Sequence, residues 1–198
     1  MGNQESAITL YYHGACKKFL ARSIPIILTL DHAEANYDIK DTSEAPPGTG
    51  FAVPMVKFES GQCISQTIAI LSALGEQFKL DGTTTEEKLM CLQTLLDLND
   101  VVTELKFGKL KEDPERYTKW LGVLEGKLKS KFFVRDEPTV ADFMGFFVLT
   151  FTSAKIGAFD AEKFPKVAQW MSDIAEVPCV KKMKEGSVPL TPPFLHKR

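Results

Sequence analysis

Two tyrosines and a cysteine stand close together near the start of the chain, in the segment Tyr11-Tyr12-His13-Gly14-Ala15-Cys16. A phenolic hydroxyl donates hydrogen bonds, and a thiol at the start of a helix has a lowered pKa and can form a mixed disulfide. Alternation along a strand predicts that Tyr11 and Tyr12 lie on opposite faces. Cys16 is explained equally well as a small packed residue. The segment therefore offers a hydroxyl and a thiol as candidate reactive groups.

A second group of candidates lies further along, at Pro54 and at Ser65-Gln66-Thr67. The latter is expected to end a strand and open a helix, where free N–H groups and the positive end of the helix dipole suit a carboxylate. The alternative is an ordinary helix cap, a common use of serine and threonine. Pro54 interrupts a predicted strand, which is typical of an edge, a bulge or a cis peptide, or else it is a loop proline without a ligand.

The elements that position these residues follow from periodicity and turn signals. Strands are predicted at Ile8–Tyr12, Asn36–Lys40, Val53–Phe58 and Cys63–Ser65. A helix between the first two strands contains Phe19, Leu20, Ile24, Ile27 and Leu28, and Pro25 is expected to kink or end it. The loop Asp41–Gly50 is predicted to be irregular, Gly61 supports a hairpin, and a second helix is predicted at Gln66–Phe78. The order is therefore βαβ followed by ββα.

Beyond residue 82 the pattern is helical throughout. Helices are predicted at Glu86–Leu110, Pro114–Lys129, Phe143–Phe151 and Phe164–Lys184, followed by a proline-rich tail. Thr139-Val140-Ala141-Asp142 is placed like an N-capping box before the third of these, with Asp in place of the usual Glu or Gln. The sequence therefore predicts an α/β domain at residues 1–82 and an all-helical domain at residues 83–198.

Composition narrows the class of protein. The chain has 198 residues, 44% of them hydrophobic, and a formal charge of -2, so it can bury a sizeable core and has no excess positive charge for nucleic acid. Its four cysteines have no zinc-ligand or disulfide spacing, and no apolar run is long enough to span a membrane. We expect a cytoplasmic protein with no metal, no nucleic-acid partner and no transmembrane segment.

The first six residues, Met1-Gly2-Asn3-Gln4-Glu5-Ser6, fit the pattern for N-myristoylation at Gly2. One acyl chain binds membranes only marginally, and no polybasic segment follows it. An unmodified start without regular structure is the preferred interpretation.

The order of elements and the residues that punctuate it resemble the cytosolic glutathione transferases over nearly the whole chain. The first matching segment is Phe51-Ala52-Val53-Pro54-Met55-Val56 with Ser65-Gln66-Thr67-Ile68-Ala69-Ile70-Leu71, which is similar to the family's V-P strand and Q-S-x-A-I helix start. The second runs from Trp120-Leu121 to Pro138-Thr139-Val140-Ala141-Asp142-Phe143, similar to the T-x-A-D signature, and the third is Phe164-Pro165-Lys166-Val167 with Trp170 and Pro178. The resemblance implies a thioredoxin-like glutathione-binding domain, a helical substrate domain and a homodimer.

By this resemblance, glutathione is the co-substrate and its parts meet particular residues. A cis bond before Pro54 would turn the backbone of Val53 toward the cysteinyl part, as an added strand pairs. Gln66 and Thr67 would hold the γ-glutamyl end, with Thr67 in place of the more common serine. Lys40 is the one cation near the loop that serves the glycyl carboxylate, and Ala52 lacks the polar side chain that the family often has before the V-P pair, so a reduced affinity for glutathione is expected.

The resemblance also implies how the thiol is activated. A free thiol with a pKa of about 8.5 is only a few per cent ionised at neutral pH, and lowering it by two units corresponds to roughly 2.7 kcal/mol. In tyrosine-dependent, sigma-like transferases the hydroxyl comes from the end of the first strand, with an arginine eleven positions on, which favours Tyr11 with Arg22. Cys16 is the alternative, because the Gly14-Ala15-Cys16 turn also resembles bacterial, beta-type transferases.

The electrophile is expected to bind in an apolar pocket beside the sulfur. Candidates are Phe107, Leu110, Phe194 and Leu195, which are equally good core residues. By resemblance Asp100 would reach the partner subunit's glutathione amine, although Asp97 and Asp100 also fit a solvated helix face or a cap.

The function expected from the resemblance is conjugation of glutathione to small hydrophobic electrophiles, a detoxification reaction. Two alternatives stay open on the same scaffold. One is a noncatalytic ligand-binding or structural protein, and the other is a glutathione-dependent thiol reductase that uses Cys16.

Overall fold

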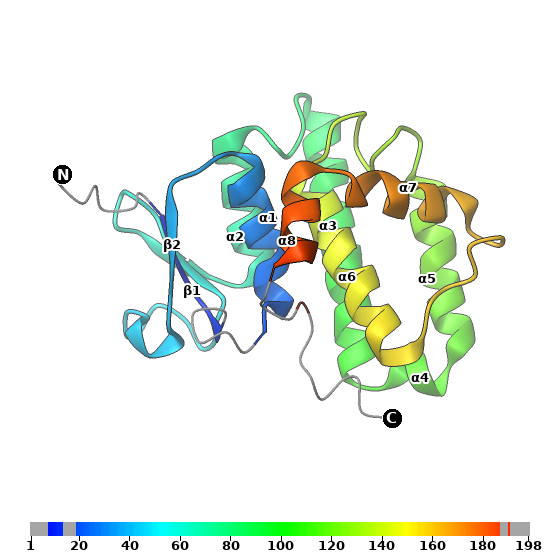
Figure 1. The fold of residues 1–198 in the computed structure, drawn as a ribbon, viewed down its shortest axis with the longest axis horizontal. Coiled ribbons are helices and arrows are strands. Elements are labelled where there is room, and N and C mark those ends of the chain that lie inside the picture. Colours follow the sequence, from blue (N-terminus) through cyan, green and yellow to red (C-terminus); the bar gives the residue numbers. More distant parts are fainter. Residues whose placement is uncertain (1–7, 14–18, 187–189, 191–198) are drawn as a thin grey trace.

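The fold was analysed in a computed structural model of the chain, which describes residues 8–13, 19–186 and 190. It contains a four-stranded sheet near the N-terminus and a larger helical region after it (Figure 1). The strands are β1 (Ile8–Tyr11), β2 (Tyr37–Lys40), β3 (Met55–Lys57) and β4 (Cys63–Ser65). They lie in the order β2-β1-β3-β4, with β1 and β2 parallel and the other two pairs antiparallel.

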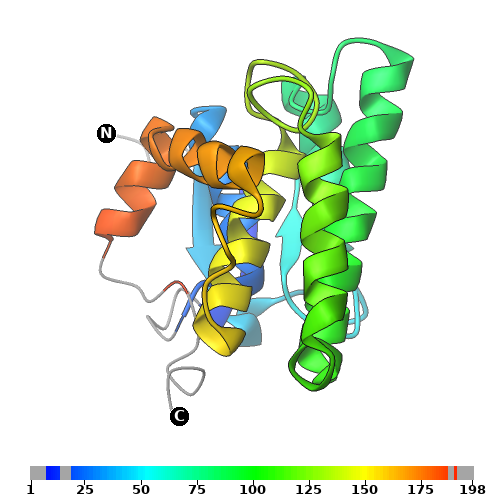
Figure 2. The same cartoon turned by 90° about the vertical axis from the view of Figure 1, so that its right-hand side faces the viewer.

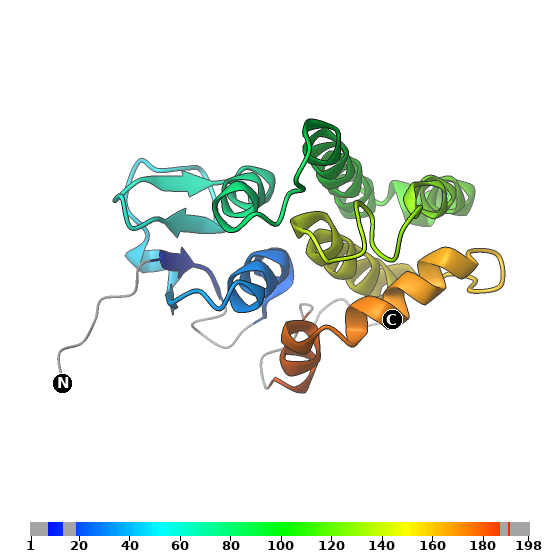
Figure 3. The ribbon, with the colours of Figure 1, turned by 90° about the horizontal axis from the view of Figure 1, so that it is seen from above.

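Two helices cover one face of this sheet. They are α1 (Ile24–His32) and α2 (Thr67–Phe78), which pack against each other and, in Figure 3, form a layer between the sheet and the helical region. Leu10 and Val56 are opposite each other in the β1–β3 ladder and are fully buried on the helix-covered face. The order βαβ followed by ββα predicted from the sequence is therefore confirmed.

The helical region is built around α6 (Val140–Ile156), whose side chains are buried nearly all round. It packs against α1 on one side and against α3 (Thr85–Lys106) on the other, so its apolar surface joins the two halves of the chain. Figure 2 shows α3 beside α5 (Pro114–Lys127), with the short α4 (Lys109–Glu112) between them in the chain. The last helices are α7 (Pro165–Ala175) and α8 (Pro178–Glu185), and α8 lies against α1.

The capping box predicted before α6 is present. The two oxygens of the fully buried Asp142 carboxylate accept hydrogen bonds from the backbone N–H and hydroxyl of Thr139, from the N–H of Phe133 and from Nε1 of Trp170, at 2.7–2.9 Å. Burial raises the pKa of Asp142, and these four donors oppose that rise. The box therefore does more than cap a helix, because it also fixes a loop and α7 to α6.

Several predicted boundaries were wrong, and proline or glycine explains each case. Pro25 does not kink α1 but stands in its first turn, where no N–H is needed. The predicted helix Phe164–Lys184 is two helices, because Pro178 cannot continue α7 and instead begins α8. The predicted helix Glu86–Leu110 ends at Lys106, since Gly108 has a φ of 82°.

Smaller differences concern the strands and the loop before β3. The strand predicted at Val53–Phe58 is limited to Met55–Lys57. The loop Asp41–Gly50 contains one 3-10 turn at Thr42–Glu44, capped by Asp41. The thioredoxin-like domain followed by a helical domain is confirmed as the fold class, and the exact boundary between residues 82 and 83 stays a prediction.

Candidate functional site

The strand register gathers the candidate residues at one end of the sheet. Lys40, Tyr11, Met55 and Ser65 are successive neighbours across β2, β1, β3 and β4. These four residues form a row across the sheet, at which β1, β2 and β4 end and β3 begins. The segments just beyond the row therefore lie at the same end of the sheet. Those segments are Val53-Pro54, before β3, and Gln66-Thr67, after β4. Residues distant in the sequence thus form one continuous edge.

The peptide bond between Val53 and Pro54 is cis, as the resemblance implied. The β1–β3 ladder stops at Met55, so the backbone of Val53 lies beyond the last paired residue. Pro54 is buried and Val53 is half-buried. The N–H and C=O of Val53 are therefore not part of the strand pairing, which is the condition for pairing with an added peptide.

The N-terminus of α2 is open. Gln66 precedes the helix with φ 75° and ψ 117°, a strained conformation for a residue other than glycine, and its side chain makes no capping hydrogen bond. Thr67, the first helical residue, is 3% exposed, and its hydroxyl has no hydrogen-bond partner within the part of the chain that the structure describes. The ordinary cap that the sequence left open as an alternative is therefore not formed.

Tyr11 and Tyr12 point to different surroundings, as strand alternation predicted. Tyr11 is in register with Met55 and Lys40 at the end of the sheet, and both tyrosines are buried. Burial raises the pKa of Tyr12, while the backbone N–H and the guanidinium of Arg22 oppose that rise. The structure thus places Arg22 against Tyr12, whereas the sequence reasoning had associated it with Tyr11.

An aromatic cluster lies next to this end of β1. The rings of Tyr12, His13 and Phe19 are 5.0–6.3 Å apart between centroids. Cys16, the alternative reactive residue, lies outside the described residues, as does Gly2.

The candidates from the helical half are in different environments. Phe107 caps the C-terminus of α3 and is 68% exposed, whereas Leu110 on α4 is 1% exposed and belongs to the core. Asp97 forms an ion pair with Lys127 of α5 at 3.0 Å, while Asp100 is exposed. Phe194 and Leu195 lie outside the described residues. These positions leave Phe107 and Asp100 as the accessible members of the group.

Two features of the site were not found by sequence reasoning. Gly50 approaches Ser65 so closely that a Cβ there would lie 2.2 Å from the serine Oγ, so only glycine lets the loop pack on the end of β4. The ammonium of Lys155 on α6 donates to the carbonyl of Leu105 at 2.9 Å, near the end of α3 that bears Phe107. A glycine after a proline-rich loop is a signal that could have been used, but the contact of Lys155 depends on helix packing.

Comparison with known proteins shows which protein families and structures the chain is similar to. Residues 95–178 match the family model described as the glutathione S-transferase C-terminal domain. No curated protein matches the chain by sequence. Among solved structures, a glutathione S-transferase specific to the nematode C. elegans is 24% identical with a TM-score of 0.73, and the alignment covers 94% of this chain and 99% of the other.

Other structural neighbours agree in fold. The glutathione S-transferase of Ascaris lumbricoides has a TM-score of 0.75 at 21% identity, covering 93% of this chain and 98% of that one. Rat hPGDS, complexed with a quinoline, has the same TM-score at 18% identity, with the same coverage. Residues 95–178 therefore match the C-terminal domain of the glutathione S-transferases, and the chain shares the fold of these solved structures. The subclass is not decided by these matches.

Two further findings concern partners. No helix among the residues that the structure describes is both long and apolar enough to cross a membrane. Within the same residues, there is no group of three or more side chains suited to hold a metal ion.

Proposed function

We propose that the protein is a glutathione transferase that conjugates the glutathione thiolate to small hydrophobic electrophiles. The observation that carries this proposal is the common position of Tyr11, Val53-Pro54 and Gln66-Thr67 at one end of the sheet. A peptide thiol paired with the backbone of Val53 would bring its carboxylate end toward α2 and its sulfur toward β1. This is the arrangement that a γ-glutamyl tripeptide requires.

The open end of α2 supports binding of the γ-glutamyl carboxylate. Gln66 provides no side-chain cap for the first N–H groups of the helix, and the hydroxyl of Thr67 is a buried donor without a partner in the described part of the chain. A carboxylate would accept hydrogen bonds from both and would benefit from the helix dipole. Lys40, at the end of β2, is the cation proposed for the glycyl carboxylate.

Tyr11 is the residue proposed to activate the sulfur, because it ends β1 on the row that leads to Val53 and Thr67. If its hydroxyl lowers the pKa of the bound thiol by about two units, the ionised fraction at pH 7 rises roughly twentyfold. Replacing Tyr11 by Phe should then lower the conjugation rate by about that factor and move the pH–rate profile to higher pH. Cys16→Ala should leave the rate unchanged.

The test combines binding and turnover. Calorimetry with glutathione should give a saturable heat, and an electron-poor aromatic halide should be conjugated at a rate that rises through one ionisation. Loss of turnover in Cys16→Ala with retention in Tyr11→Phe would instead support the thiol reductase. Tight binding of an apolar dye without any turnover or heat from glutathione would indicate a noncatalytic ligand-binding protein.

Phe107 and Lys155 are proposed to border the electrophile site. Phe107 exposes an aromatic ring at the end of α3, and the neighbouring ammonium of Lys155 is held by the carbonyl of Leu105. Rat hPGDS is complexed with a quinoline, and a flat aromatic electrophile is the substrate class that an exposed ring would favour here. Leu110 supports this wall from the core, and Phe194 is proposed as a further contact.

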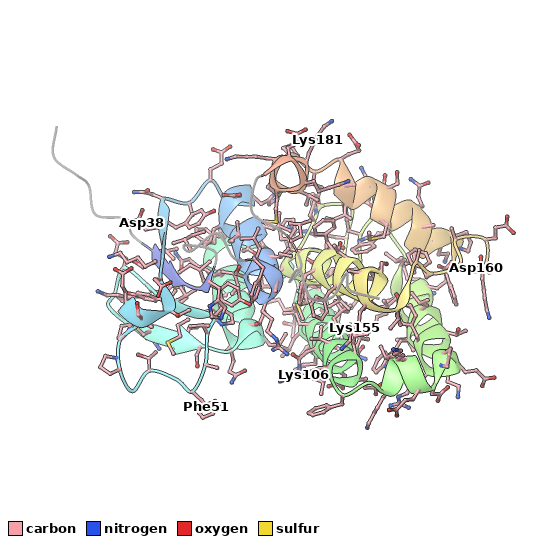
Figure 4. All side chains as sticks on the ribbon, turned by 60° about the horizontal axis from the view of Figure 1, so that its bottom comes forward. Asp38, Phe51, Lys106, Lys155, Asp160 and Lys181 are labelled. Atoms are coloured by element: carbon pink, nitrogen blue, oxygen red, sulfur yellow. The ribbon has the colours of Figure 1, made fainter. Side chains whose placement is uncertain are left out.

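A homodimer is proposed from the outward face of α3. Leu89, Leu92 and Leu96 recur at helical spacing on the side opposite the buried residues and are 62%, 42% and 49% exposed. Asp100 continues the same stripe and is exposed, which fits a role at the partner's glutathione. In Figure 4, Phe51 also projects away from the ribbon.

The dimer is tested by Leu92→Glu together with Leu96→Glu, which should convert a dimer to a monomer in light scattering. Val123 on α5 is similarly exposed but lies off the stripe, so Val123→Glu is the matched control. A wild-type protein that is monomeric at micromolar concentration would refute this part of the proposal.

Cytoplasmic location and the absence of a lipid on Gly2 are proposed as well. Mass spectrometry of the N-terminal peptide tests the absence of the lipid.

A further inference from the structure

A cavity lies on the opposite side of β2 from the site described above. It is open to solvent, has a volume of about 200 Å³ and is bordered by α1, β2 and the end of α8, which lies beside α1 in Figures 1 and 3. Ile39 lines it, whereas its neighbour Lys40 belongs to the row at the end of the sheet. Because successive side chains of a strand point to opposite faces, the cavity and the row are separated by the sheet. The residues that line it are Leu20, Ile27, Asp31, Ile39, Lys182, Met183 and Gly186.

The chemistry of the cavity depends on Asp31, in the last turn of α1. Its Oδ1 accepts a hydrogen bond of 2.8 Å from the hydroxyl of Tyr37. Burial and the nearby Asp31 both raise the pKa of Tyr37, so this hydroxyl stays a donor. Among the described residues only Oδ1 accepts a side-chain hydrogen bond, which leaves Oδ2 as an acceptor.

The negative charge of Asp31 has no ion-pair partner among the residues that the structure describes. Burial, with a contribution from this carboxylate, raises the pKa of Cys179 on α8 to about 11. Lys182 lines the same cavity but is exposed, so its ammonium is solvated by water. A half-buried carboxylate without a cation favours a positively charged ligand.

The remaining walls are apolar. Leu20, Ile27, Ile39 and Met183 face the cavity, and the methionine side chain can adapt to the shape of a ligand. We infer that this cavity binds a small apolar amine, with its ammonium on Oδ2 of Asp31 and its apolar body between α1 and α8. A volume below the roughly 300 Å³ of the smallest typical ligand pockets limits the molecule to about one ring and a short chain.

An anionic ligand is disfavoured by the same contacts. An anion on Lys182 would have to approach Asp31, and like charges repel strongly where water is partly excluded. An uncharged ligand of the same shape would fill the walls but leave the carboxylate without a cation. The charge of the ligand is therefore the property that the structure selects.

The experiment compares three probes of similar shape: phenethylamine, phenethyl alcohol and phenylpropanoate. Binding is followed by the NMR signals of the Met183 methyl group and of the Tyr37 ring. Phenethylamine should bind saturably, and the alcohol and the anion should bind at least tenfold more weakly. Equal affinity for all three probes would overturn the inference.

Amino-acid substitutions in the pocket test whether the amine binds there. Asp31→Asn keeps a carbonyl for the Tyr37 hydroxyl and should reduce affinity for the amine about tenfold without changing that for the alcohol. Ile39→Trp, which fills the cavity, should abolish binding of both. Glu59→Gln removes one exposed carboxylate at the β3–β4 turn and is the matched control, with no expected effect. An unchanged affinity in Asp31→Asn would contradict the site.

Two further measurements test whether the amine binds at this pocket and not at the glutathione site, and whether the pocket is free to accept it. Glutathione and phenethylamine should bind without competition, and competition would overturn the location, whereas failure of glutathione to bind at all would affect only the proposed function. Leu190 accepts a hydrogen bond from the N–H of Ala21, next to Leu20, so the chain passes close to the cavity. If the amine binds only after residues 191–198 are deleted, the cavity belongs to the protein's own tail and the inference fails.

Discussion

Two helices of this protein have a threonine at their start, α6 at the N-cap position and α2 at the first helical position, and their first N–H groups are treated differently. At α6, Thr139 and the buried Asp142 form a closed set of hydrogen bonds that also includes Phe133 and Trp170. At α2, Gln66 provides no side-chain cap, and the hydroxyl of the buried Thr67 has no partner in the described chain. The same residue type is thus satisfied by the protein in one place and left unsatisfied in the other.

The difference separates a structural helix start from one that suits a ligand. A buried donor without a partner costs about 1–3 kcal/mol, and a left-handed Gln66 adds a cost of similar order. Natural proteins retain such costs mainly where a ligand removes them. The closed start of α6 contributes stability instead, because four donors from three segments share one carboxylate.

The largest expected effect follows from removing the buried carboxylate at the start of α6. Asp142→Ala should reduce the free energy of unfolding by about 3–5 kcal/mol, since it leaves Trp170, Phe133 and Thr139 without their acceptor. Urea unfolding monitored by tryptophan fluorescence measures the change. Asp142→Asn retains one acceptor and should lose less. A loss below about 1 kcal/mol for the alanine variant would show that the network is not important for stability.

A second prediction concerns the uncapped start of α2. Thr67→Val replaces the unpaired hydroxyl by a methyl group of the same shape and should raise the free energy of unfolding by about 1 kcal/mol. Under the proposed function it should also weaken binding of glutathione about tenfold, because a hydrogen bond to a charged group is worth roughly 1.5–3 kcal/mol. Thermal unfolding and calorimetry report the two effects separately. A destabilised variant would mean that the hydroxyl is satisfied in the protein itself.

The start of α3 provides an exposed example for comparison. Thr84 accepts a hydrogen bond from the N–H of Glu87 at 3.1 Å, and the Glu87 carboxylate accepts from Thr83 and Thr84. Thr84→Ala should cost about 1 kcal/mol, the usual value for loss of an N-cap. Urea unfolding gives this number, with Thr85→Ala as the matched control one residue inside the helix. An equal loss in both variants would argue against a specific capping effect.

The smallest effect is a pH dependence of this same start. Hydrogen bonds from Thr83, together with the N–H of Thr84, lower the pKa of Glu87 below its usual value. Its contribution to stability is therefore complete above the pKa of the unfolded chain, about 4.5, and is lost as the pH falls through the lower folded value. The difference in melting temperature between wild type and Glu87→Gln should shrink between pH 6 and pH 3. A difference that grows on acidification would contradict this sign.

Much of the fold could be predicted from the amino-acid sequence alone. The strand Cys63–Ser65 was predicted with its observed bounds, and the predictions Asn36–Lys40 and Gln66–Phe78 each began one residue too early. The errors in the helices were at Pro25, Gly108 and Pro178, residue types that have several permitted positions in or beside a helix. Whether such a residue begins, divides or ends a helix depends on the packing of its neighbours and not on local propensity.

The candidate site was predicted less completely. Tyr11, Val53-Pro54 and Gln66-Thr67 were named from the sequence, and the register then placed them at one end of the sheet. The association of Arg22 with Tyr12 was missed, because it depends on how the 3-10 turn Ala21–Ser23 leads into α1. Local pattern has no information on which of two adjacent tyrosines an arginine eleven residues away will meet.

The sequence by itself determined the helices and strands, the cis-compatible Pro54 and the capping box at Thr139-Val140-Ala141-Asp142, because each depends on residues a few positions apart. Only the tertiary structure decided that Asp142 also binds Trp170, that Thr67 is buried with no hydroxyl partner among the described residues, and that Asp31 lines a pocket with α8. These are properties of contacts between distant segments. Their energies depend on burial, and burial is set when the sheet, α1 and α6 pack together.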